Sequence, residues 1–86
     1  MNEILWHNRA RKQIKLIPTK ERETIHDRID LLAGFPDVAG VDVKPLTGHQ
    51  YGYRLRVGRY RILFDYNNGV KVISIQEVKK RDERTY

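Results

Sequence analysis

The feature that most constrains the fold of this chain is the alternation of apolar and basic side chains over residues 53–66. In the first part of that stretch the apolar positions are Tyr53, Leu55 and Val57, and the basic positions are Arg54 and Arg56. A period of two residues is typical of a strand with one buried face and one solvated face. Gly58 marks a tight turn, so we predict two strands, over residues 52–57 and 59–66.

A third strand is predicted over residues 70–78, after an Asn-Asn-Gly sequence at 67–69. Asn and Gly tolerate positive φ and are therefore a hairpin signal. Strands joined by hairpins form an antiparallel meander, which can keep one face in contact with water. We expect helices to cover the face that carries Leu55 and Phe64. The opposite, concave face then carries three arginines, which are Arg54, Arg56 and Arg61.

The first part of the chain predicts one more strand and a helical hairpin. Residues 2–7 are short and apolar-rich, as expected of a strand. Asn8 suits the N-cap of a helix over residues 9–17. Pro18 ends that helix because its ring blocks continuation from the preceding turn.

Thr19 is expected to cap a second helix, which Gly34 ends. The apolar stripe of this helix repeats at helical spacing and consists of Ile25, Ile29 and Leu32. The turn-rich residues 35–43 then connect the helix to the meander. Because the stripe must pack on the sheet, the sequence predicts a single α+β domain over residues 1–86. Its parts are an N-terminal strand, a helical hairpin and a three-stranded antiparallel meander packed on the helices.

All of the excess positive charge lies in the meander and in the segment that follows it. The formal net charge of the 86 residues is +6. Residues 1–43 carry seven basic and seven acidic side chains, whereas residues 44–86 carry ten basic and four acidic ones. A short sheet with one sign of charge suggests a surface for phosphates.

Composition excludes several classes of protein. The chain has no Cys, so we expect no disulfide framework and no thiolate metal site, which is compatible with the cytoplasmic location that we expect. The N-terminus does not resemble a signal peptide, and no apolar run approaches the ~18 residues of a membrane span. A chain of this length leaves room for one core and a shallow site, so we expect no cofactor and no metal.

The three arginines of the concave face are expected to form one small patch. Cross-strand neighbours lie ~4.5–5.5 Å apart at Cβ, and the arginine fork matches phosphate oxygens bidentately. The segment KKRDERTY after the last strand adds four basic side chains and an aromatic one, which are Lys79, Lys80, Arg81, Arg84 and Tyr86. A tyrosine can stack on a base or transfer a proton. The alternative is that each arginine simply lies on a solvated strand face, and the uneven division of charge favours a shared site instead.

The order of strand, helical hairpin, three-stranded meander and basic tail resembles the RelE/ParE superfamily of bacterial toxin–antitoxin toxins over nearly the whole chain. The local matches are KPLTG (44–48), YRLRVGRYRILFDY (53–66) and VKKRDERTY (78–86). Within the superfamily, the chain is most similar to the RelE-type mRNA interferases. The resemblance implies a ribosome-dependent endonuclease that inhibits translation. Such a toxin cleaves mRNA in the ribosomal A site through attack of a 2′-OH on the adjacent phosphate.

The resemblance also implies roles for individual residues. The expected catalytic residues are Arg61 of the family's Tyr-Arg pair, Arg81 after the last strand, and the tail aromatic Tyr86. The expected RNA-binding residues are Arg54, Arg56, Lys44, Lys79, Lys80 and Arg84. The implied partners are a cognate acidic antitoxin, held in a hetero-oligomer, and the 30S A site of the ribosome with its mRNA.

One departure from the family concerns proton transfer. Several relatives use His, Glu or Asp as acid and base, and we expect no such pair on the basic face. His7, His26 and His49 are interpreted as surface or packing residues on the first strand, a helix and a turn. Arginine stays protonated up to a pKa above ~12 and is a poor base. The expected mechanism therefore relies on electrostatic stabilisation and on positioning by the ribosome.

Two other functions remain open at this point. A ParE-like member of the superfamily would bind DNA gyrase and cleave nothing itself. A basic adaptor would bind RNA or the ribosome without chemistry. The joint presence of arginines on two strands, Arg81 and Tyr86 favours the endonuclease.

Overall fold

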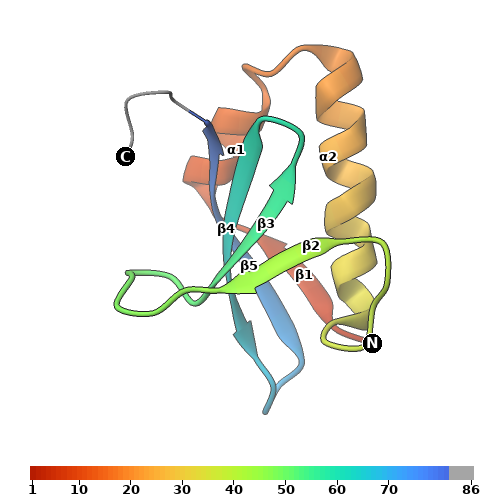
Figure 1. The fold of residues 1–86 in the computed structure, drawn as a ribbon, viewed down its shortest axis with the longest axis vertical. Helices are drawn as coiled ribbons and strands as arrows, with labels where there is room; N and C mark the ends of the chain where they lie inside the picture. The colour runs from red at the N-terminus through yellow and green to blue at the C-terminus, as the bar shows by residue number, and fades with distance from the viewer. Residues whose placement is uncertain (82–86) are drawn as a thin grey trace.

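The computed structural model describes residues 1–81, which form an α+β fold (Figure 1). The elements in chain order are β1 (Glu3–Trp6), α1 (Asn8–Ile14), α2 (Thr19–Leu31), the 3-10 helix η1 (Leu32–Gly34), β2 (Asp42–Pro45), β3 (Tyr53–Val57), β4 (Tyr60–Asn67) and β5 (Val72–Lys80). The predicted fold class is confirmed, and β3, β4 and β5 are the predicted meander, with bounds within two residues of those expected. No helix within residues 1–81 has the length and apolar content needed to cross a membrane.

The strands form one five-stranded sheet in the order β1-β5-β4-β3-β2. β1 pairs parallel with β5, and every other neighbouring pair is antiparallel. In Figure 1, α2 runs along one flank of the strongly twisted sheet, and β2 crosses in front of β3. The last strand of the meander therefore lies between the first strand of the chain and β4.

Strand β2 was not predicted, since residues 35–43 were interpreted as a turn-rich connection. β2 is short and lies at the sheet edge, where Asp42 opposes Arg56 and Lys44 opposes Arg54 across the β2–β3 ladder. Four residues that end in a proline carry too little alternation to identify a strand. Pairing with the arginine-bearing strand β3, which follows it in the chain, defines it instead.

The helix ends differ from those predicted by one to three residues. His7, with extended backbone, is the N-cap of α1 in place of Asn8, and the helix ends at Ile14 rather than at residue 17. A residue that precedes a proline is disfavoured in the α conformation, which shortens the helix before Pro18. Pro18 is itself the N-cap of α2, where its carbonyl accepts the Arg22 N–H at 2.9 Å. Thr19 is consequently the first residue of α2 rather than its cap.

The hairpin between β4 and β5 is confirmed, but its geometry differs from the one that the Asn-Asn-Gly sequence predicts. Positive φ occurs at Lys71, with a value of 57°, and not at the asparagines or Gly69. The side-chain oxygen of Asn67 accepts the N–H groups of Gly69 and Val70 at 3.0 and 3.3 Å. The turn is thus stabilised by an asparagine side chain that bonds to the backbone ahead of it.

The core lies between the helices and the face of the sheet that was predicted to be apolar. Leu55, Ile62 and Phe64 from the sheet are fully buried against Ile29 and Leu32 of the helical segment. Burial of one such side chain stabilises a fold by about 1.5–3 kcal/mol.

Helix α1 covers the edge of β5 beyond the point where β1 ends. The side-chain oxygen of Gln13 accepts the Val78 N–H at 2.7 Å, so a helix side chain takes the place of a neighbouring strand. An edge strand otherwise presents unpaired backbone groups. The end of β5 that leads to Arg81 is therefore held by α1 on one side and by β4 on the other.

We expect Leu55→Asp to unfold the protein. Leu55 is completely buried, and an unpaired carboxylate there should cost more than about 3 kcal/mol of unfolding free energy. Arg56→Asp is the matched control, because Arg56 follows in the same strand and is exposed on the other face. Its unfolding free energy should change by about 0.5 kcal/mol. Thermal unfolding followed by circular dichroism measures both, and a folded Leu55→Asp variant would show that the two faces are assigned wrongly.

Candidate nucleic-acid interface

Three basic side chains form a row across three neighbouring strands. Arg56 of β3 lies opposite Arg61 of β4, and Arg61 lies opposite Lys79 of β5. Like charges directly opposite each other in a sheet are destabilising, by roughly 0.2–1 kcal/mol for each pair. A bound anion that bridges the row would remove that repulsion.

A second row runs parallel to the first and is less strongly charged. Lys44 of β2 lies opposite Arg54 of β3, which lies opposite Leu63 of β4. The Arg54 side chain is only 16% exposed, and its guanidinium lies 3.6 Å from a carboxylate oxygen of Asp42. Leu63 is buried and provides an apolar floor. Arg54 is therefore partly neutralised by Asp42, which also lies opposite Arg56 at the β2 end of the first row.

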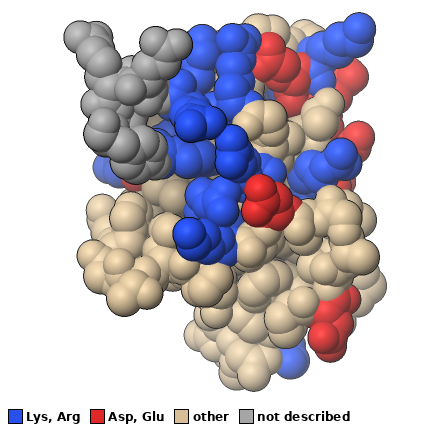
Figure 2. Space-filling model, viewed as in Figure 1, with Lys and Arg blue, Asp and Glu red and all other residues tan. Residues whose placement is uncertain are grey.

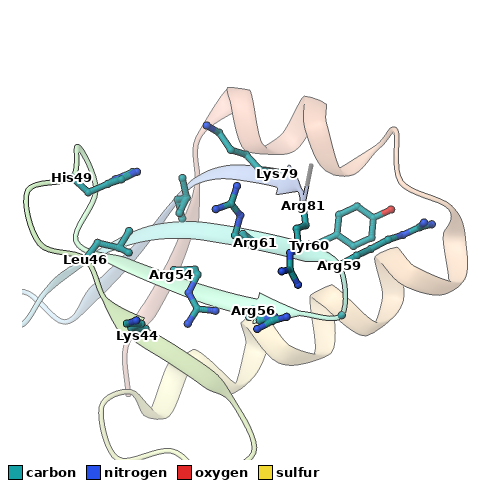
Figure 3. A pocket seen from close by; sticks show the side chains of 12 residues that line it. Lys44, Leu46, His49, Arg54, Arg56, Arg59, Tyr60, Arg61, Lys79 and Arg81 are labelled. Carbon is teal, nitrogen blue, oxygen red and sulfur yellow. The ribbon is translucent and has the colours of Figure 1, made fainter. Parts of the chain in front are cut away.

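The two rows line a cavity of about 540 Å³. Figure 2 shows Lys and Arg side chains gathered in one band over this side of the sheet, and Figure 3 shows those that line the cavity. The basic lining residues are Lys44, Arg54, Arg56, Arg59, Arg61, Lys79 and Arg81. The volume lies within the ~300–1,000 Å³ range of ligand pockets. The lining residues come from β2, the loop after it, β3, β4 and the end of β5.

The loop between β2 and β3 is held in place by one carboxylate. Asp65 of β4 accepts the Gly52 N–H at 2.8 Å and the Gln76 side-chain amide at 3.1 Å. The Leu46 N–H also donates to the Gly52 carbonyl at 2.8 Å, which closes the base of the loop. These bonds position Leu46 and His49 at the wall of the cavity.

The opposite end of the cavity is formed by the turn between β3 and β4. Gly58 has a φ of 56°, which favours glycine, and Arg59 follows it. The Arg59 carbonyl accepts the backbone N–H of Arg81 at 2.6 Å, so Arg81 continues the ladder beyond the end of β5. The Arg59 guanidinium donates to both carboxylate oxygens of Glu21 in α2, at 2.9 and 3.4 Å.

The ion pair at this turn changes the acidity of its members. The hydrogen bond from Arg59 holds the pKa of Glu21 below its ordinary value, and a hydrogen bond with Tyr60 acts in the same direction. The hydrogen bond to Glu21 raises the pKa of Arg59. Burial raises the pKa of Tyr60, and its hydrogen bond to Glu21 adds to the effect. All three pKa shifts favour the charged forms of Glu21 and Arg59 and the neutral form of Tyr60.

Most of the predicted site residues lie together. Arg54, Arg56, Arg61, Lys44, Lys79 and Arg81 all line the one cavity. Lys80 does not, because neighbouring residues of a strand point to opposite faces. Lys80 instead lines a separate hollow with Gln13 and Ile17. The predicted residues Arg84 and Tyr86 lie outside the described residues.

The sequence interpretation missed the position of His49. His7 precedes α1, and the ring of His26 lies 5.2 Å from that of Trp6, but His49 lines the cavity. Its Nδ1 accepts the Tyr51 N–H at 3.0 Å. His49 lies in the loop after the unpredicted strand β2, and no local sequence pattern places it at the cavity. Within residues 1–81, no three His, Asp or Glu side chains gather as ligands for a metal ion.

A comparison with known protein families shows to which family the chain belongs. Residues 4–85 match the family described as ParE toxin of type II toxin–antitoxin system, parDE. The chain belongs to this toxin family. The resemblance to the RelE/ParE superfamily seen in the sequence is therefore confirmed. A search of curated proteins gives no significant match to the toxin.

Solved structures of RelE toxins share the toxin's fold. The archaeal RelE–RelB complex from Pyrococcus horikoshii OT3 is 27% identical, with a TM-score of 0.80 over 95% of this chain and 97% of that chain. The RelB–RelE complex from Methanococcus jannaschii is 25% identical, with a TM-score of 0.73 over 88% of each chain. The isolated E. coli RelE toxin is 16% identical and shows the fold alone, with a TM-score of 0.79 over 99% of this chain and 89% of that chain.

We expect the Glu21 carboxyl to titrate at a lower pH than an ordinary glutamate, and Arg59→Gln to raise its midpoint. The pKa of Glu21 is lower in the folded state than in the unfolded chain. The pair therefore stabilises the fold above the unfolded pKa, and this contribution is lost as pH falls through the folded pKa. A carboxyl-carbon NMR titration measures the midpoint. Arg28→Gln, which removes an exposed arginine farther along α2, should leave it unchanged, and an unmoved midpoint in Arg59→Gln would contradict the assignment.

Proposed function

We propose that this toxin is a ribosome-dependent mRNA endonuclease, and that the cavity of the concave face binds the scissile phosphate. The observation that carries the proposal is the row of Arg56, Arg61 and Lys79 in direct cross-strand register. The fold places these three cations side by side on neighbouring strands. An RNA backbone supplies the anion that makes such a row favourable.

The proposed reaction is the attack of a 2′-OH on the adjacent phosphate. The bond from phosphorus to the 5′-oxygen breaks, which leaves a 2′,3′-cyclic phosphate and a 5′-OH. Negative charge builds on the phosphate oxygens in the transition state. Arg61, in the middle of the row, would stabilise that charge through its two-pronged guanidinium, with Arg56 and Lys79 on either side.

Proton transfer needs a group other than arginine, and His49 supports this part of the proposal. Because its Nδ1 accepts the Tyr51 N–H, the neutral ring carries its proton on Nε2. Figure 3 shows the His49 ring extending from the loop over the cavity. His49 can thus donate a hydrogen bond to a phosphate or to a leaving oxygen. Tyr86 remains a second proposed proton-transfer group, outside the described residues.

Binding to the ribosome would supply the remaining rate acceleration. The described residues that line the cavity supply charge but no carboxylate base, so the proposed enzyme depends on the A site of the 30S subunit to align the 2′-OH with the phosphate. The predicted result is weak cleavage of free RNA and strong cleavage of mRNA on ribosomes, in the cytoplasm.

A second candidate function follows from the family description, which names ParE. A ParE-like toxin would inhibit DNA gyrase and cleave no RNA. Two assays with the purified toxin separate the candidates: mapping of 5′-OH ends on mRNA bound to programmed ribosomes, and supercoiling by gyrase. Inhibited supercoiling with intact mRNA would overturn the endonuclease.

The proposed partner is an acidic antitoxin in a hetero-oligomer. The similar RelE toxins from P. horikoshii and M. jannaschii were solved in complex with RelB. An acidic segment could fold on this toxin by pairing with the cationic row. Leu16, in the turn after α1, is 86% exposed and offers an apolar anchor outside the cavity.

We expect Arg61→Ala to lower the rate of mRNA cleavage on ribosomes by ~10²–10³-fold, because it removes a contact to the transition-state phosphate. Arg28→Ala is the matched control, since it removes the same charge from the exposed surface of α2. The melting temperature of each variant must be measured as well, because Arg61 is half-buried. Cleavage at the wild-type rate by folded Arg61→Ala would remove this residue from the active site.

Association with the antitoxin should slow by an order of magnitude or more as ionic strength rises, because opposite charges accelerate encounter. Dissociation should change little, since apolar contacts set its rate. Stopped-flow binding at low and high salt measures both rates. Arg56→Gln should reduce the salt dependence, whereas Arg28→Gln should not. An association rate that does not change with ionic strength would show that the antitoxin first contacts the toxin away from the cavity.

A further inference from the structure

Arg81 lies just past the last strand and depends on one turn for its position. β5 ends at Lys80, and the Arg81 N–H donates to the Arg59 carbonyl at 2.6 Å. This bond extends the β4–β5 ladder by one residue. It turns the backbone so that the Arg81 side chain lines the cavity (Figure 3).

The acceptor of that bond lies in a tight turn that is fastened to a helix. Arg59 follows Gly58 between β3 and β4, and both oxygens of Glu21 accept its guanidinium N–H groups. Arg59 and Glu21 are 38 residues apart, so the pair joins the first turn of α2 to the turn of the meander. The Arg59 guanidinium also lies 5.8 Å from the ring centre of the buried Tyr60, which fixes the direction of the side chain.

The direction of the Arg59 side chain separates its role from that of the other cavity arginines. Figure 3 shows Arg59 extending away from the group formed by Arg54, Arg56 and Arg61. Its charge is neutralised at Glu21, at the far end of the cavity. What Arg59 contributes toward the cavity is its backbone carbonyl, which holds Arg81.

We propose that Glu21 and Arg59 are positioning residues, which hold the turn so that its carbonyl fixes Arg81 at the cavity. The inference rests on the proposed function, in which Arg81 acts on RNA. The chain of contacts runs from the Glu21 carboxylate to the Arg59 guanidinium, through the Arg59 backbone to its carbonyl, and on to the Arg81 N–H. Loss of the ion pair frees the turn, and the terminal ladder bond opens more often.

The size of the effect follows from the exposure of the pair. The Arg59 and Glu21 side chains are 55% and 37% exposed, so water screens their attraction. Exposed pairs contribute modestly, which corresponds to a change of about two- to fivefold in the opening of the bond. The effect is thus a graded loss of position, while the core strands stay folded.

Backbone amide hydrogen exchange, followed by NMR on the full chain, tests the proposal without any substrate. In Glu21→Gln and in Arg59→Gln, the Arg81 amide should exchange about two- to fivefold faster, while the amides of Ile62 and Phe64 keep their rates. Glu23→Gln, in the same helix, is the matched control and should change nothing. The charge-swapped double variant, Glu21→Arg with Arg59→Glu, should restore protection at Arg81. Unchanged exchange at Arg81 in both single variants would overturn the proposal.

The rate of mRNA cleavage on ribosomes then tests whether the position of Arg81 affects the proposed activity. Glu21→Gln should slow cleavage by about two- to fivefold in the wild-type background and have no further effect in Arg81→Ala. Equal effects in both backgrounds would mean that the pair does not act through Arg81, which also overturns the proposal. If the wild-type toxin cleaves no mRNA, the endonuclease function fails, and hydrogen exchange alone still decides whether the pair holds Arg81.

Discussion

The structure depends on the coupling between apolar burial on one face of the sheet and charge on the other. Because side chains alternate along a strand, burying Leu55 and Ile62 against the helices fixes Arg56 and Arg61 on the concave face. Each buried side chain contributes about 1.5–3 kcal/mol, whereas each cross-strand repulsion costs roughly 0.2–1 kcal/mol. The free energy gained by burying the core therefore exceeds the cost of repulsion between the cations, so the core sets their spacing.

The same alternation explains how much could be predicted from the sequence. The period of two residues in 53–66 was enough to identify β3, β4, the core face and the arginine face. It also explains why Lys80 lies apart from the other predicted site residues. The segment after residue 78 was treated as a tail that contributes all its charges, but β5 continues to Lys80, so Lys79 and Arg81 line the cavity and Lys80 between them does not.

Features that arise from contacts between different elements were not predictable from the periodicity within one element. β2 is a strand because it pairs with β3, and its loop is fixed by the bond from Gly52 to Asp65. His49 enters the cavity only through those contacts. The ion pair of Glu21 and Arg59 could not be predicted from the sequence pattern of the helix or of the strand. Each residue by itself resembles any other charged side chain at the surface. The row of cations could be predicted from the alternation along each strand, whereas the residues that form the walls of the cavity could be identified only from the tertiary structure.

The place of β5 in the sheet has a consequence for the timing of folding. β5 is made last among the strands, yet it lies between β1 and β4 and contacts α1. Glu3 pairs with Val72, so closing the sheet requires contact across nearly the whole chain. Long-range closure of this kind is slow compared with local contacts. During synthesis, β1 and α1 cannot pack against β5 until residues 72–80 have left the ribosome. A nascent chain consequently carries an incomplete cation row, and the cavity is complete only after translation of β5 is finished.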